Sequence, residues 1–184
     1  SNGYVTAFLG KNHNPPEWEA GSMGPFDHWP TGLGFDYFYG FNQAWADQWA
    51  PELVENTTQI EPPNDTDYII DKDLSDRAIE WLRRRENSAP EAPFFIYLAP
   101  GSPHTPLHAP ADWIARYKGK FDMGWDKARE VIFARQKELG VIPQDAVLTE
   151  RPDELPAWDS LSEDEQRVAA RMMEVYAAQL SHSD

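Results

Sequence analysis

Short apolar runs alternate with one amphipathic stretch in the first half of the chain. The run at 4–10 predicts a buried strand, and the short apolar run at 94–99 predicts a second strand. Residues 35–41 predict a short aromatic strand or turn, and 53–60 has the length of a small hairpin. The stretch 71–86 carries apolar residues at helical spacing, with three arginines near its end, which favours a helix C-terminus there. This order of strand, helix and strand predicts an α/β fold with crossover helices.

The second half of the chain has helical rather than alternating periodicity. Residues 126–139 predict one helix, and residues 163–180 predict another that begins with a capping box formed by Ser162 and Glu165. The proline-rich segment 141–158 between them predicts a linker or a surface loop. The second helix carries large apolar residues at every fourth position, on one face: Val168, Met172, Tyr176 and Leu180.

Two of the predicted strands run into loops that carry candidate site residues. Lys11 and His13 follow the first strand, and His104 follows the later one within Pro-Gly-Ser-Pro-His-Thr-Pro. Residues two apart in an extended chain point to the same side, so Lys11 and His13 are expected to face one space. Ligands of open α/β sheets bind beyond the carboxyl ends of strands, where a lysine and two imidazoles suit an anion and proton transfer. The simpler alternative is a solvated lysine with structural histidines.

These segments resemble the sulfatase family of the alkaline-phosphatase-like superfamily. Members carry Gly-Lys-Trp-His after a strand, and later Pro-Phe-Phe-x-Tyr followed by Pro-His-x-Pro. The matching segments here are 3–13 and 93–107, and 24–41 is similar to a branch of bacterial arylsulfatases. The resemblance continues through 118–122 to 173–177 and so covers nearly the whole chain. It implies a portion of an alkaline-phosphatase-like sheet flanked by helices, with a helical C-terminal half.

The resemblance also implies roles for three residues. Lys11 and His104 would contact the sulfate and the leaving oxygen of a sulfate ester. His13 would hydrogen-bond the formylglycine hydrate or act on it as a base. Asn12 stands where the family has tryptophan, which leaves substrate preference and local packing open.

Several parts of the family's catalytic apparatus have no counterpart in this sequence. The chain has no cysteine and no Ser-x-Pro-x-Arg, so the motif that matures to formylglycine is absent. The metal-binding aspartates and the second active-site lysine are absent too. Calcium (or magnesium) and formylglycine are therefore expected in the full-length enzyme, with no metal bound by these residues. We predict that 1–184 is a central fragment of an arylsulfatase catalytic domain, which is inactive alone.

Composition narrows the expected partners. The formal net charge of −15 argues against nucleic acid and against anionic membrane surfaces. No apolar run approaches the length of a membrane-spanning helix. A soluble protein, cytoplasmic or periplasmic, that acts on a small-molecule sulfate ester is expected, and its oligomeric state is left open.

Two other functions fit the same residues. A phosphodiesterase or phosphonate hydrolase of the same superfamily would bind a similar anion, and a non-catalytic module would bind an anion or a carbohydrate. His108 is a candidate for the rim of the site or for the surface, whereas His28 and His182 are expected to be structural or solvent-facing. A set of aromatic residues predicts either an aryl-accepting pocket or a packed loop core: Trp18, Trp29, Tyr37, Phe38, Trp45 and Trp49.

Overall fold

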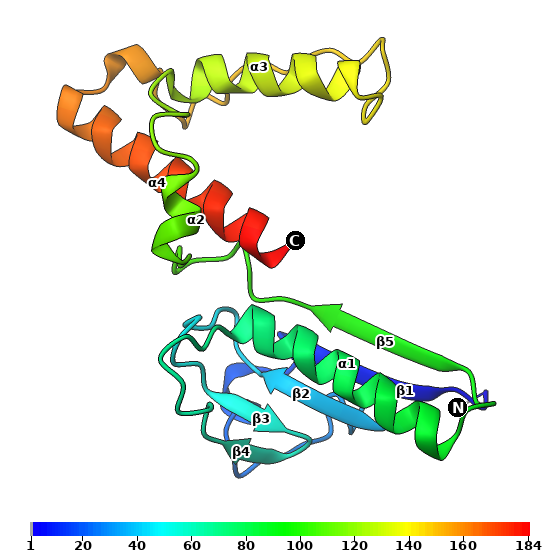
Figure 1. The fold of residues 1–184 in the computed structure, drawn as a ribbon. Coiled ribbons are helices and arrows are strands. Elements are labelled where there is room, and N and C mark those ends of the chain that lie inside the picture. The colour runs from blue at the N-terminus through cyan, green and yellow to red at the C-terminus, as the bar shows by residue number, and fades with distance from the viewer. Residues whose placement is uncertain (1) are drawn as a thin grey trace. The chain divides into compact units, whose positions relative to one another are not determined.

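The computed structural model describes residues 2–184 and divides into two compact units. The first contains the residues up to 108, and the second contains residues 109–182. All five strands lie in the first unit, and the second is helical (Figure 1). No helix among residues 2–184 combines the length and the apolar character needed to cross a membrane.

The first unit is built on a mixed five-stranded sheet with the order β4-β3-β2-β1-β5. Strand β1 lies between β2 and β5 and runs parallel to both, whereas β3 and β4 form an antiparallel hairpin beside β2. The five strands confirm the predicted strand segments and the predicted hairpin: β1 (Val5–Lys11), β2 (Tyr37–Phe41), β3 (Leu53–Glu55), β4 (Thr58–Ile60) and β5 (Phe94–Ala99).

Glycines allow the three parallel strands to approach closely at their carboxyl ends. Gly10 of β1 is in register with Gly40 of β2 and with Ala99 of β5. Gly10 has a φ of +111°, and a Cβ added to it would lie 1.9 Å from the backbone oxygen of Ala99. Because a side chain would be excluded there, glycine is required at this position. Because β1 and β5 are parallel, the loops that follow them leave the sheet at the same edge.

Helix α1 (Ile70–Ser88) covers one face of the sheet, as Figure 1 shows. Leu74 and Ala78 of this helix pack against Ala7 and Leu9 of β1, which alternate with Phe8. Phe8 belongs to a separate apolar cluster with other members from the loop before β2 and from the sheet: Trp29, Phe38 and Val54. The alternation of β1 therefore supplies both cores, as expected for a strand covered on its two faces.

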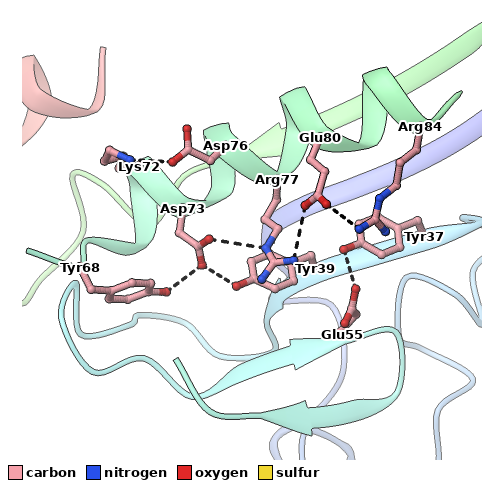
Figure 2. A network of polar contacts seen from close by, with 10 residues as sticks. All are labelled: Tyr37, Tyr39, Glu55, Tyr68, Lys72, Asp73, Asp76, Arg77, Glu80 and Arg84. Atoms are coloured by element: carbon pink, nitrogen blue, oxygen red, sulfur yellow. Dashed lines mark hydrogen bonds and ion pairs between the residues drawn. The ribbon is translucent and has the colours of Figure 1, made fainter. Parts of the chain in front are cut away.

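A polar network joins α1 to β2 beside the apolar contacts (Figure 2). Asp73 accepts hydrogen bonds from the hydroxyl groups of Tyr39 and Tyr68, and its carboxylate lies 3.6 Å from Arg77. The Arg77 guanidinium also lies over the Tyr39 ring, 4.7 Å from its centroid. Burial, reinforced by the hydrogen bond to Asp73, raises the pKa of Tyr39 well above its usual value. The phenol therefore stays a neutral donor, and the network fixes the helix against the strand.

The second unit contains α2 (Ala111–Ala115), α3 (Gly124–Glu138) and α4 (Glu163–Ser183). The two long predicted helices are confirmed, and α2 is an addition to them. The predicted capping box is present at the start of α4: the backbone N–H and the hydroxyl of Ser162 donate to the Glu165 carboxylate at 2.8 and 2.6 Å. The hydrogen bonds to Ser162 lower the pKa of Glu165.

The predicted apolar stripe of α4 is exposed, from 44% at Tyr176 to 58% at Val168. Other positions form the buried face of this helix: Ala170, Glu174, Ala178 and Gln179. Strand β5 is similar, because Ile96 is partly buried whereas the other four of its five large apolar residues are 43–49% exposed: Phe94, Phe95, Tyr97 and Leu98. Periodicity identified which residues share a face of α4, but it did not show whether that face is covered.

Candidate functional site

Lys11 and His13 lie side by side at the carboxyl edge of the sheet. Both line an open cavity of about 390 Å³, which confirms that they face one space. Lys11 is half-buried at the end of β1, and His13 is exposed. The remaining wall comes from the same loop, from the loop before β2 and from β5: Phe8, Asn14, Phe35, Tyr97, Ala99 and Pro100. An ammonium group and an imidazole beside a partly apolar wall can bind an anionic ester.

Asn12 points to the protein interior between these two residues and is fully buried. Its side-chain N–H donates to Asn42 Oδ1 at 2.7 Å, and its own Oδ1 accepts from Asn14 Nδ2 at 2.7 Å. Its backbone N–H donates to the carbonyl of Phe41 at 2.9 Å. The amide pair thus joins the residue after β1 to the residue after β2. Asn12 therefore holds its neighbours by hydrogen bonds.

His104 is held in the loop that follows β5. Its backbone N–H donates to the Gly101 carbonyl at 3.2 Å, and its ring Nδ1 lies 2.8 Å from the Thr105 carbonyl oxygen. A carbonyl can only accept, so Nδ1 donates this hydrogen bond and carries a proton. His104 does not line the cavity of Lys11 and His13, but Pro100 of the same loop does.

Two buried residues that sequence reasoning missed hold the loop of His104. The Asp71 carboxylate, in the first turn of α1, accepts a hydrogen bond from the backbone N–H of Gly101 at 3.0 Å. Gln48 donates through Nε2 to the Ser102 hydroxyl at 3.2 Å and accepts from the Asp71 backbone N–H at 3.4 Å. The only signal in the sequence was an acidic residue at a helix start, which is more often a cap.

His108 contacts the same region without reaching the cavity of Lys11 and His13. Its Nδ1 lies 3.4 Å from the Gln48 backbone N–H and 3.7 Å from the Asp47 carboxylate. Its ring stacks on the Trp49 indole, with the centroids 4.3 Å apart. These contacts place His108 in loop packing rather than among the cavity-lining groups.

The two remaining histidines have structural contacts, as expected. His28 Nδ1 lies 2.5 Å from the Glu19 carboxylate, and this hydrogen bond raises the pKa of His28. The His182 ring contacts the Trp113 indole edge to face, with the centroids 5.3 Å apart. His28 is not among the residues that line the cavity of Lys11 and His13.

The aromatic residues between 18 and 49 divide between the core and the surface. Trp29 and Phe38 are fully buried, which supports the packed-core alternative for these two. Trp45 is 53% exposed and lines a second open cavity, of about 660 Å³, together with His13. This second cavity also has carboxylates and amides in its wall and contains no lysine or arginine: Glu17, Asn42, Gln43 and Glu52.

The residues described do not form a metal site. Over residues 2–184, no group of three or more histidines and carboxylates is arranged to hold an ion. Asp71 Oδ1 instead accepts from the Gly101 backbone N–H, and the Asp73 carboxylate accepts from two tyrosine hydroxyl groups. No catalytic step is therefore assigned to a metal held by these residues.

Comparison with known proteins identifies the family. The Sulfatase family model matches residues 1–184. The chain belongs to the sulfatase family. An uncharacterized sulfatase of Schizosaccharomyces pombe is 31% identical over 191 residues, which cover 99% of this chain and 34% of the relative. An arylsulfatase of Klebsiella aerogenes is 37% identical over 94 residues, or 51% of this chain and 20% of the relative. The chain thus spans about a third or less of the length of these relatives.

Solved structures give the same fold. The crystal structure of Ps i-CgsB in complex with a neocarrahexaose matches 99% of this chain and 34% of its own, with 19% identity and a TM-score of 0.52. A structure from work on glycosaminoglycan metabolism by Bacteroides thetaiotaomicron matches the same shares, with 17% identity and a TM-score of 0.54. These neighbours confirm the α/β class and its sulfatase-like sheet, with the helical C-terminal region.

Proposed function

We propose that this chain is the central part of a longer sulfatase that hydrolyses sulfate esters in the manner of an arylsulfatase. Family membership supports sulfate ester hydrolysis at the level of the family. The observation that carries the proposal is the placement of Lys11 and His13 in one cavity at the carboxyl edge of the sheet. The exposed apolar faces of β5 and α4 favour a longer protein, because apolar surfaces of this kind are normally covered.

Hydrolysis of a sulfate ester requires stabilisation of the negative charge on the non-bridging sulfate oxygens and a proton for the leaving oxygen. We assign the first task to the Lys11 ammonium group, which can sit against the non-bridging sulfate oxygens. We assign the second to Nε2 of His104, since Nδ1 is directed at a carbonyl. His13 is assigned to hydrogen bonding with the attacking group. The nucleophile and the metal ligands are proposed to come from other parts of the full-length protein.

The second cavity beside His13 supports a proposal about the leaving group. The exposed indole of Trp45 offers a flat surface on which an aryl or sugar ring can stack. The carboxylates of Glu17 and Glu52 in its wall would repel a second anionic group. We therefore propose a leaving alcohol that carries no further sulfate or carboxylate.

Kinetics with 4-nitrophenyl sulfate and 4-nitrophenyl phosphate test the proposed reaction in the full-length protein. The sulfate ester should be the better substrate, and Lys11→Ala should lower kcat/KM by roughly 100-fold or more, as for other lost oxyanion contacts. Lys127→Ala is the matched control, because Lys127 is exposed on α3 and pairs with Glu130. Residues 1–184 alone should show no turnover. A preferred phosphate ester, or a Lys11→Ala variant with full activity, would contradict the proposal.

A further inference from the structure

Asp71 is a buried carboxylate whose position calls for an explanation. Its side chain lies in the first turn of α1, and the residue is only 5% exposed. One oxygen, Oδ1, accepts from the Gly101 backbone N–H, whereas Oδ2 is buried without a hydrogen-bond partner among residues 2–184. Burial of a carboxylate costs free energy unless hydrogen bonds compensate for the lost hydration. We therefore expect this contact to have a structural or functional role.

Two successive hydrogen bonds lead from Asp71 to His104. The Gly101 N–H donates to Asp71 Oδ1 at 3.0 Å. The carbonyl of the same glycine accepts from the backbone N–H of His104 at 3.2 Å. Gly101 is itself buried, whereas His104 is exposed. The carboxylate is therefore connected to the histidine backbone through a single residue.

Gln48 supports the same loop from a second direction. It is 2% exposed, and its side-chain amide links the Ser102 hydroxyl to the backbone N–H of Asp71. Its backbone carbonyl accepts from the Ile70 N–H at 2.8 Å. The loop of His104 is thus attached at consecutive residues, Gly101 and Ser102, to two buried side chains.

We propose that Asp71 is a positioning residue that sets the place of the His104 imidazole for proton transfer to the leaving oxygen. This inference rests on the proposed role of His104. A displacement of a reacting group by about 1 Å can lower a rate by roughly 100-fold. Asp71→Ala in the full-length protein should accordingly lower kcat for 4-nitrophenyl sulfate by about 10- to 100-fold and change KM by less than about threefold.

Conservative and matched variants separate positioning from general stability. Asp71→Asn keeps a carbonyl oxygen for the Gly101 N–H, so kcat should stay within about threefold of wild type. Asp73→Asn is the matched control, because Asp73 lies on the same helix but binds Tyr39 and Tyr68 instead of the loop (Figure 2). Its kcat should also stay within about threefold of wild type.

A double-mutant cycle with His104→Ala gives the decisive kinetic result. If Asp71 acts through His104, adding Asp71→Ala to His104→Ala should change kcat by less than about twofold. An equal loss of kcat in the two backgrounds would overturn the inference, as would a wild-type kcat for Asp71→Ala.

Hydrogen exchange of the loop amides gives a readout that does not depend on turnover. Exchange of the Gly101 and His104 amides, which donate the two hydrogen bonds, should be at least tenfold faster in Asp71→Ala than in wild type and unchanged in Asp73→Asn. An unchanged rate in Asp71→Ala would overturn the positioning of the loop. A wild-type protein without sulfate ester activity but with this exchange pattern would refute the proposed function and leave the attachment of the loop to Asp71 supported.

Discussion

Replacement of Asn12 by alanine tests how the ends of β1 and β2 are held together beside the site. The substitution removes the donor to Asn42 Oδ1 and the acceptor for Asn14. Asn42 is 5% exposed and its Nδ2 already has no partner among residues 2–184, so its amide would be left buried and unsatisfied. An orphaned buried acceptor costs about 1–3 kcal/mol, and the bond to Asn14 contributes about 1 kcal/mol. The variant should therefore lose roughly 2–4 kcal/mol of stability.

Urea unfolding of the full-length protein, followed by tryptophan fluorescence, measures this loss. Asn14→Ala is the matched control, because the Asn14 backbone N–H still donates to Asn12 Oδ1 at 3.4 Å after the exposed side chain is removed, so the cost should be about 1 kcal/mol or less. An Asn12→Ala variant within about 0.5 kcal/mol of wild type would refute the reasoning that the buried amide pair joins the two strands.

Three further predictions follow from named contacts. Gly10→Ala should prevent accumulation of folded protein, because its Cβ would lie 1.9 Å from a backbone oxygen of β5; soluble yield and circular dichroism check this. Tyr39→Phe removes a donor to Asp73 (Figure 2) and should cost about 1–2 kcal/mol in urea unfolding. The pKa of His28 is raised in the folded protein, so its bond to Glu19 stabilises the fold fully at pH values below the unfolded pKa of 6.5. This stabilisation is lost as the pH rises through the folded pKa. NMR titration should therefore give a pKa above 6.5 for His28 and a normal pKa in Glu19→Gln.

Local patterns predicted most of the elements, because apolar periodicity depends on neighbours in the chain. The strand at 94–99 was predicted with its observed bounds, and the helix predicted at 71–86 extends over Ile70–Ser88. The same alternation correctly predicted that Lys11 and His13 face one cavity. Helix α2 has only five residues, which is too short for periodicity to reveal.

Contacts between distant residues could not be predicted from one sequence. Asp71 and Gly101 are 30 positions apart, and nothing local distinguishes this carboxylate from a helix cap. Trp18 and Trp29 lie in one loop, yet the first is 81% exposed and the second is fully buried. Their burial depends on the tertiary arrangement, which also decides that Asn12 finds a partner in Asn42.

The most direct test of the proposed site is the dependence of rate on the leaving group. Values of kcat/KM for aryl sulfates whose phenols span several pKa units should be measured for the full-length wild type and for His104→Ala. If His104 gives a proton to the leaving oxygen, its loss should slow poor leaving groups most, so the variant should show a steeper dependence on phenol pKa. Equal slopes for the two proteins would contradict the assignment of His104 as the proton donor.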